Sequence, residues 1–71
     1  MIKEFDLINL DCAHCALIME KNISKKLGVK TTIDFMAQKL IIDSENELSD
    51  NEKEEIQKLI KKVEPDCKVD F

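Results

Sequence analysis

Two cysteines three positions apart are the residues of this chain best suited to chemistry. They stand in the run Asp11-Cys12-Ala13-His14-Cys15. Two thiolates at this spacing can turn toward one point, where the positive end of a following helix would lower their pKa values. Asp11 adds an oxygen ligand, and two sulfurs with one oxygen suit a divalent ion such as zinc or cadmium better than copper(I). The run therefore predicts a metal site formed by Asp11, Cys12 and Cys15.

Length and charge limit the classes of protein to which the chain can belong. With 71 residues we expect one small domain, residues 1–71, near the lower limit at which a hydrophobic core alone stabilises a fold. A formal net charge of -4 argues against nucleic acid as a partner and favours a cation. Three cysteines do not fit a closed disulfide framework, so we expect reduced thiols in the cytosol. No secretory signal and no apolar run of ~20 residues is present, so this segment is not expected to insert into a membrane.

Apolar residues recur with the periods of strands and helices along the chain. Strands are expected over residues 3–10, 29–35, 39–43 and 67–71, and helices from about 13 or 14 to 27 and from about 50 to 63. Gly28 is expected to end the first helix. Ser49 and Glu52 are expected to form a capping box at the start of the second helix, and Pro65 cannot continue that helix. The alternation slips at Asn9, which predicts a bulge with left-handed backbone.

The order of these elements predicts the fold class. Strand, helix, strand, strand, helix, strand is the split βαβ arrangement. We therefore expect an α+β, ferredoxin-like βαββαβ sandwich, in which a four-stranded antiparallel sheet carries both helices on one face.

The chain resembles the heavy-metal-associated domain, the small ferredoxin-like module of metallochaperones and of the cytosolic N-terminal extensions of metal-transporting P-type ATPases. The family pattern places a glycine, an apolar residue and a polar residue before Cys-x-x-Cys, and later a Gly-Val pair that opens the second strand. This sequence has Asn9-Leu10-Asp11-Cys12-Ala13-His14-Cys15 and then Gly28-Val29, and the resemblance covers nearly all of it. By position, the resemblance assigns the metal-ligand roles to Asp11, Cys12 and Cys15.

Two further features of the resemblance bear on the choice of metal. Asp before the first cysteine resembles the branch that exports zinc, cadmium and lead, whereas copper domains usually carry an uncharged residue there. The run Glu64-Pro65-Asp66 lacks the Tyr, Phe or Lys that copper-handling members tend to place beside the site. The resemblance therefore implies Zn²⁺ or Cd²⁺, with Pb²⁺ also accommodated and Cu⁺ disfavoured.

Several residues near the site have two interpretations. Asp11 could instead be a helix N-cap that accepts backbone N–H groups. His14 is expected to be an exposed loop side chain rather than a ligand. Cys67 begins the last strand close to the metal loop, where it either packs in the core or assists as a ligand. Leu17 and Ile18 flank the apolar stripe of the first helix, and one of them is a candidate docking contact.

The function expected from these features is metal binding for a transporter. The chain would deliver its ion to a heavy-metal-translocating P-type ATPase, or regulate that ATPase, by ligand exchange at Asp-Cys-x-x-Cys. It would be a non-catalytic, monomeric, cytosolic domain of a membrane protein, whose partners are the transmembrane and cytosolic domains of the ATPase. The alternative is a free-standing cytosolic metallochaperone, including one for Cu(I). A thiol oxidoreductase is disfavoured, because the chain lacks the length and the proline loop of a thioredoxin-like fold.

Overall fold

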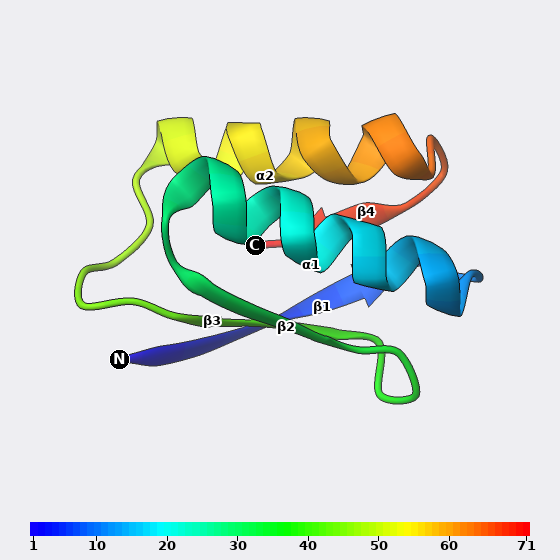
Figure 1. Cartoon of the computed structure of the whole chain (residues 1–71), viewed down its shortest axis with the longest axis horizontal. Coiled ribbons are helices and arrows are strands. Elements are labelled where there is room, and N and C mark those ends of the chain that lie inside the picture. Colours follow the sequence, from blue (N-terminus) through cyan, green and yellow to red (C-terminus); the bar gives the residue numbers. More distant parts are fainter.

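A computed structural model describes all 71 residues of the chain. The six elements are β1 (Ile2–Ile8), α1 (Ala13–Leu27), β2 (Lys30–Asp34), β3 (Lys39–Asp43), α2 (Asp50–Val63) and β4 (Lys68–Asp70) (Figure 1). The order and the approximate bounds predicted from the sequence are confirmed.

The four strands form one antiparallel sheet in the order β2-β3-β1-β4. Both helices lie side by side on one face of this sheet, as Figure 1 shows, and the predicted ferredoxin-like fold is confirmed. The register between β1 and β4 pairs Ile8 with Lys68, so the last strand begins beside the end of the first. This pairing brings the loop after β1 close to the loop before β4.

The helix ends follow the predicted capping residues. Gly28 ends α1 in the left-handed conformation, at φ +67°, and its N–H donates to the carbonyl of Ser24. Ser49 and Glu52 form both hydrogen bonds of the capping box at the start of α2. The second helix ends at Val63, two residues before Pro65, as the missing N–H of proline requires.

The backbone after β1 departs partly from the prediction. Asn9 adopts φ +64°, so the expected left-handed residue is confirmed. The strand nevertheless ends at Ile8, and Asn9 forms a bend beyond it rather than a bulge within a longer strand. The bend turns Leu10 back toward the core, where only 3% of its surface is exposed.

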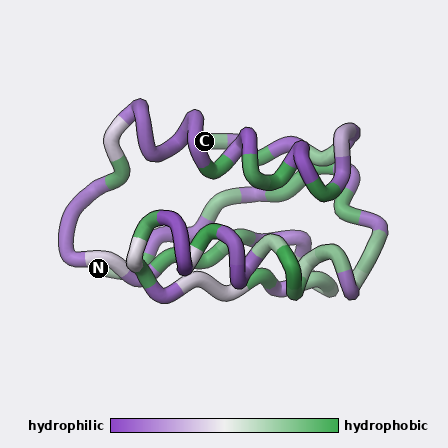
Figure 2. The backbone as a smooth tube through the Cα atoms, turned by 45° about the horizontal axis from the view of Figure 1, so that its top comes forward, coloured by the Kyte–Doolittle hydropathy of each residue, from purple (hydrophilic) through white to green (hydrophobic).

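The core lies between the sheet and the two helices. In Figure 2 hydrophobic residues recur along each helix and strand between hydrophilic ones, as expected for elements with one buried face. Twelve buried residues form one cluster: Leu7, Leu10, Ala16, Met19, Ile23, Ile33, Leu40, Ile42, Ile56, Ile60, Cys67 and Val69. Met19 and Cys67 are fully buried, which confirms packing roles for both. Leu17 and Ile18 are both exposed on α1, at 57% and 36%.

Side chains of the helices occupy the outer edges of the sheet. Glu20 of α1 accepts a hydrogen bond from the N–H of Ile33 on the edge strand β2. Gln57 of α2 accepts from the N–H of Val69, at 2.9 Å, and donates to the carbonyl of Cys67 beside the other edge strand, at 3.3 Å. These bonds occupy backbone groups through which another strand could pair with the sheet.

Candidate metal site

Three connecting segments meet at one end of the molecule, on the right in Figure 1. They are the β1–α1 loop, the β2–β3 turn and the α2–β4 loop. The side-chain amide of Asn9 in the first of these donates to the carbonyl of Asp66 in the third, at 3.4 Å. The N–H of Asp11 donates to a carboxylate oxygen of Glu64, at 3.5 Å. The loop that carries the cysteines is therefore attached to the loop that follows α2.

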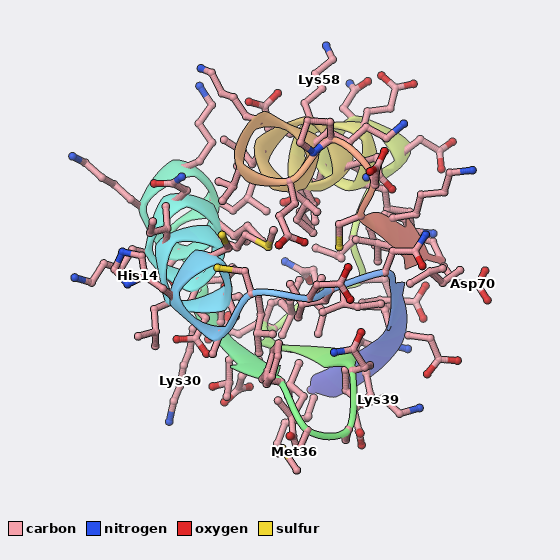
Figure 3. All side chains as sticks on the ribbon, turned by 90° about the vertical axis from the view of Figure 1, so that its right-hand side faces the viewer. His14, Lys30, Met36, Lys39, Lys58 and Asp70 are labelled. Carbon is pink, nitrogen blue, oxygen red and sulfur yellow. The ribbon has the colours of Figure 1, made fainter.

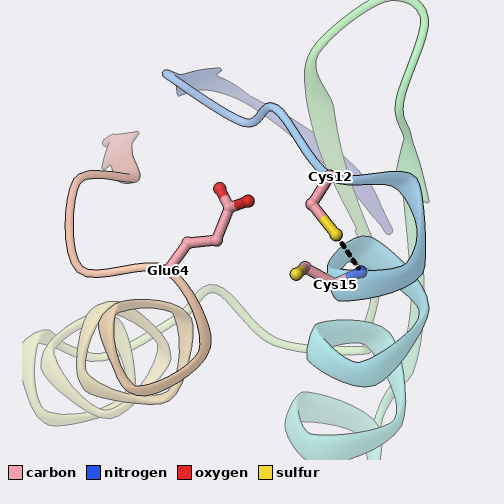
Figure 4. Close-up of side chains that lie close together, drawn as sticks. All are labelled: Cys12, Cys15 and Glu64. Atoms are coloured by element: carbon pink, nitrogen blue, oxygen red, sulfur yellow. Dashed lines mark hydrogen bonds between the residues drawn. The ribbon is translucent and has the colours of Figure 1, made fainter.

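The two thiols lie at the start of α1. Cys12 is the N-cap of the helix, and its Sγ accepts a hydrogen bond from the N–H of Cys15 at 3.1 Å (Figure 4). The alternative that Asp11 caps this helix is therefore wrong, because the sulfur of the next residue occupies that role. Both cysteines are half-buried and neither is in a disulfide.

Glu64 brings a carboxylate to the thiols from the opposite side. One ligand atom from each of Cys12, Cys15 and Glu64 lies within 4.8 Å of the other two. Figure 4 shows the Glu64 side chain extending from the end of α2 toward the two cysteines. Sequence reasoning missed this residue, since it lies 49 positions after Cys15 and was considered only as part of a loop without aromatic residues. The one available signal was that the strand order brings this loop beside the cysteines.

Asp11 is placed beside the site, but it is not a member of this group of three. Its side chain is exposed, and its N–H donates to Glu64. Asp11, Cys15 and Glu64 all line one cavity of about 340 Å³ at the surface. The ligand role of Asp11 stays a prediction, because this arrangement places the carboxylate near the thiols without bringing it into the three-residue group.

The charges around the thiols act against the predicted lowering of their pKa values. Hydrogen bonding with Cys12 raises the pKa of Cys15 to about 11, with further contributions from burial and from the negative charges of Cys12 and Glu64. Burial, together with the charges of Glu64 and Asp11, raises the pKa of the Cys67 thiol to about 11. The expectation that the helix dipole lowers the thiol pKa values is therefore wrong for Cys15, because the hydrogen bond with Cys12, burial and the nearby negative charges outweigh the partial charge of a helix end.

The two remaining candidate ligands are His14, which is exposed, and Cys67, which is buried in the core. His14 is exposed, and in Figure 3 its imidazole points outward from the end of the molecule that carries the loops. Cys67 is fully buried in the core, and its N–H donates to the carbonyl of Glu64. The exposed placement predicted for His14 and the packing predicted for Cys67 are both confirmed.

The group of three has dimensions that an ion can bridge. A tetrahedral zinc site with Zn–S bonds of about 2.3 Å needs sulfurs about 3.8 Å apart, and a linear arrangement of the same bonds needs about 4.6 Å. The limit of 4.8 Å on the separation of the ligand atoms is compatible with both spacings. The spacing admits both kinds of ion, so the ligand charges must supply any preference.

No family model and no curated protein sequence matches the chain. Solved structures do match. One, from work on crosstalk between Cu(I) and Zn(II) homeostasis, is 15% identical with a TM-score of 0.67, over 99% of this chain and 96% of that one. The CopZ metallochaperone is 11% identical with a TM-score of 0.70, over 99% and 100%. The yeast copper transporter domain Ccc2a, solved in apo and Cu(I)-loaded states, is 17% identical with a TM-score of 0.69, over 99% and 94%.

The chain shares the ferredoxin-like fold of these three structures. The match spans the chain from end to end, and the Cys12–Cys15 pair stands at the start of the first helix of this fold. None of its helices has the length and apolar character needed to cross a membrane.

Proposed function

We propose that this chain binds a heavy-metal ion as its cargo, through the sulfurs of Cys12 and Cys15 and the carboxylate of Glu64. The observation that carries the proposal is the convergence of these three groups within 4.8 Å. They come from two separate elements, the start of α1 and the end of α2. Sulfur and carboxylate are ligands that zinc and cadmium accept.

The charge of the ligands supports a divalent ion. Two thiolates and one carboxylate around a dication leave a net charge of about -1, and around a monocation about -2. In a half-buried site the more negative total is less favourable, because an unbalanced charge is costly where water is partly excluded. Asp11, which lines a surface cavity with Cys15 and Glu64, is the proposed fourth ligand after a side-chain rotation, and water would be its substitute. With the charge of Asp11 added, a dication leaves about -2 and a monocation about -3, so the divalent ion still leaves the smaller excess of charge. Zn²⁺ and Cd²⁺ are therefore the proposed ions, and Pb²⁺ is also compatible.

The proposed mechanism is ligand exchange with a partner protein. Cys12 and Cys15 are half-buried and therefore reachable by a second pair of cysteines, so an ion can be transferred between two proteins without being released to water. The partner proposed is a heavy-metal-translocating P-type ATPase, to which the chain, as one domain over residues 1–71, delivers its ion or whose activity it regulates. The free state of all three cysteines fits a reducing compartment, and the cytosol is proposed on that ground.

A second candidate is a free-standing metallochaperone for Cu(I). What favours this candidate is the fold match to the CopZ metallochaperone and to the yeast copper transporter domain solved with Cu(I). The same two sulfurs would bind the ion in near-linear geometry, and Glu64 would then add a negative charge beside the site without acting as a ligand. The two candidate functions therefore differ in the role of Glu64, which is a metal ligand in the first and not in the second.

A competition experiment separates them. The reduced protein is titrated with Cd²⁺, Zn²⁺ and Cu(I) in buffers of known metal affinity, with binding followed through the cadmium-thiolate absorbance. The proposal expects one equivalent of Cd²⁺ to bind and to be lost in the Cys12→Ser and Cys15→Ser variants. Absence of Cd²⁺ binding by the reduced protein, or occupancy by Cu(I) alone when free ions are buffered to intracellular levels, would contradict it.

The role of Asp11 is tested in the same titration. Asp11→Ala is expected to weaken zinc and cadmium binding, because it removes the proposed fourth ligand. Unchanged zinc affinity in Asp11→Ala would remove this carboxylate from the site and leave the two sulfurs and Glu64.

A further inference from the structure

We propose that Gln38 is a positioning residue for the metal loop, which holds the backbone of Leu10 so that the cysteines after it stay in binding geometry. The proposal rests on the proposed metal binding and deepens it. It adds a residue from the β2–β3 turn, an element that contributes no ligand.

The Gln38 side chain binds both backbone groups of one residue. Its Oε1 accepts from the N–H of Leu10 at 3.1 Å, and its Nε2 donates to the carbonyl of Leu10 at 2.9 Å. The same Nε2 also donates to the carbonyl of Phe35 across the turn, at 2.9 Å. The amide therefore fixes the position and the orientation of Leu10 relative to the turn, since two opposed bonds to one residue resist both translation and rotation.

The backbone of Gln38 is also hydrogen-bonded to the segment that leads into the metal loop. Its carbonyl accepts from the N–H of Leu7 at 2.8 Å, near the end of β1. Gln38 has φ +56°, a conformation that glycine adopts more easily than any other residue. Glycine would relieve this backbone cost, but it would lack the amide that binds Leu10. The structure thus combines a disfavoured backbone with a side chain that glycine cannot replace.

The position of Leu10 gives this contact its effect on the site. Leu10 directly precedes Asp11 and Cys12, and its side chain is anchored in the core at 3% exposure. On the other side of the loop, the N–H of Asp11 is held by Glu64. A Glu64 carboxylate that turns toward an ion weakens that link, whereas the contact from Gln38 involves no ligand and persists. Gln38 is therefore a support of the Leu10 backbone that remains when the ion binds, in addition to the bond from Asn9 to Asp66 in the same loop.

Restricting the loop before binding lowers the entropy lost when the ion binds. We expect Gln38→Gly and Gln38→Ala to lower Cd²⁺ affinity about tenfold, mainly by faster dissociation. Gln38→Gly is the more informative variant, because glycine at φ +56° removes the amide while relieving the backbone. Its thermal stability should equal or exceed that of Gln38→Ala, and its comparison with wild type separates a loss of affinity from a weakened fold.

The matched control is Gln57→Ala. It also removes an uncharged side chain that accepts from one backbone N–H and donates to a carbonyl, on β4 and its approach rather than on the metal loop. Gln57→Ala should change Cd²⁺ affinity less than threefold. Hydrogen exchange of the Leu10 amide in the metal-free protein gives a second measurement, in which Gln38→Gly should exchange at least tenfold faster than wild type.

The outcomes are distinct. A wild-type protein that binds no cadmium overturns the proposed function and, with it, this proposal. Wild-type binding together with unchanged affinity in Gln38→Gly, or with an equal loss in Gln57→Ala, overturns the role of Gln38 alone. A Leu10 amide that exchanges equally fast in wild type and Gln38→Gly shows that the contact does not restrain the loop.

Discussion

Replacing Glu64 with glutamine should weaken the binding of a divalent ion more than that of a monovalent ion. The variant keeps the length of the side chain and removes one negative charge from the group of three. An ion held between the three groups lies no farther from the Glu64 oxygen than 4.8 Å, the limit on the separation of the ligand atoms. At that distance a unit positive charge and the carboxylate attract by about 0.9 kcal/mol in water and about 3.5 kcal/mol at an effective dielectric constant near 20, so these are lower bounds. A dication feels this attraction twice and a monocation once. The Cd²⁺ loss should therefore exceed the Cu(I) loss by at least about 0.9 kcal/mol, about fourfold in affinity.

The proton on Cys15 changes the measured affinity for Cd²⁺ and for Cu(I), but it does not change the ratio of the two affinities. Glu64 is one of the anions that raise the pKa of Cys15, so its replacement also makes this thiol easier to deprotonate. That change strengthens binding at neutral pH and partly offsets the lost attraction. Since either ion must displace the same proton, the effect cancels when the two affinities of one variant are divided. The ratio of Cd²⁺ to Cu(I) affinity therefore isolates the direct action of the carboxylate.

The assay is a competition titration of each ion against a chelator at one fixed pH, for wild type, Glu64→Gln and Asp66→Asn. Asp66→Asn is the matched control, because it removes an equal charge from an exposed position in the same loop, outside the group of three. It should leave the affinity ratio within about twofold of wild type, since exposed charges are screened. An equal fall of both affinities in Glu64→Gln, or an equal change of the ratio in Asp66→Asn, would show that the Glu64 charge does not select a divalent ion.

Three further predictions concern the fold and its titrating thiols. Gly28→Ala should lower the free energy of unfolding by about 1–2 kcal/mol in chemical denaturation, because φ +67° is costly for alanine although its Cβ would meet no neighbouring atom. Ser49→Ala should lower the free energy of unfolding by about 1 kcal/mol, since the capping box loses its hydroxyl. Wild-type stability in Gly28→Ala or Ser49→Ala would contradict the role of that residue in ending or starting its helix. The metal-free protein should be fully stable below pH 9 and lose stability as pH rises from 9 toward 11, because folding raises the pKa of Cys15 and Cys67 from 9.0 to about 11 and deprotonation then favours the unfolded chain. Chemical denaturation at several pH values checks this, and a flat profile, or one that Cys67→Ala leaves unchanged, would oppose it.

The fold could be predicted from the sequence because its signals are local. Gly28 and the Ser49–Glu52 pair set helix ends through contacts within a few residues, and the alternation around Leu40 fixes which face of a strand is buried. The Cys12–Cys15 pair was identifiable for the same reason, since its spacing alone indicates a site. Even the left-handed residue Asn9 was identifiable from a slip in the alternation.

The parts of the site that the sequence did not reveal depend on contacts between distant segments. Glu64 approaches the thiols because β4 pairs with β1, and nothing within its own loop marks it as a ligand. Gln38 reaches Leu10 across 28 positions, and a glutamine in a hairpin turn gives no local sign of that contact. The pKa of Cys15 was predicted in the wrong direction because the helix end was visible in the sequence, whereas the hydrogen bond with Cys12, the burial of the thiol and the approach of Glu64 depend on the folded geometry.

The ligands around the ion can be counted directly by X-ray absorption spectroscopy of the reduced protein with one equivalent of Cd²⁺. We expect two sulfur ligands, from Cys12 and Cys15, with the remaining positions filled by oxygen, and we expect Glu64→Gln to lose an oxygen contribution or to lose binding. A shell of three or four sulfurs would contradict this expectation, since the third cysteine is buried in the core. A shell of oxygen and nitrogen alone would show that the thiol pair does not hold the ion.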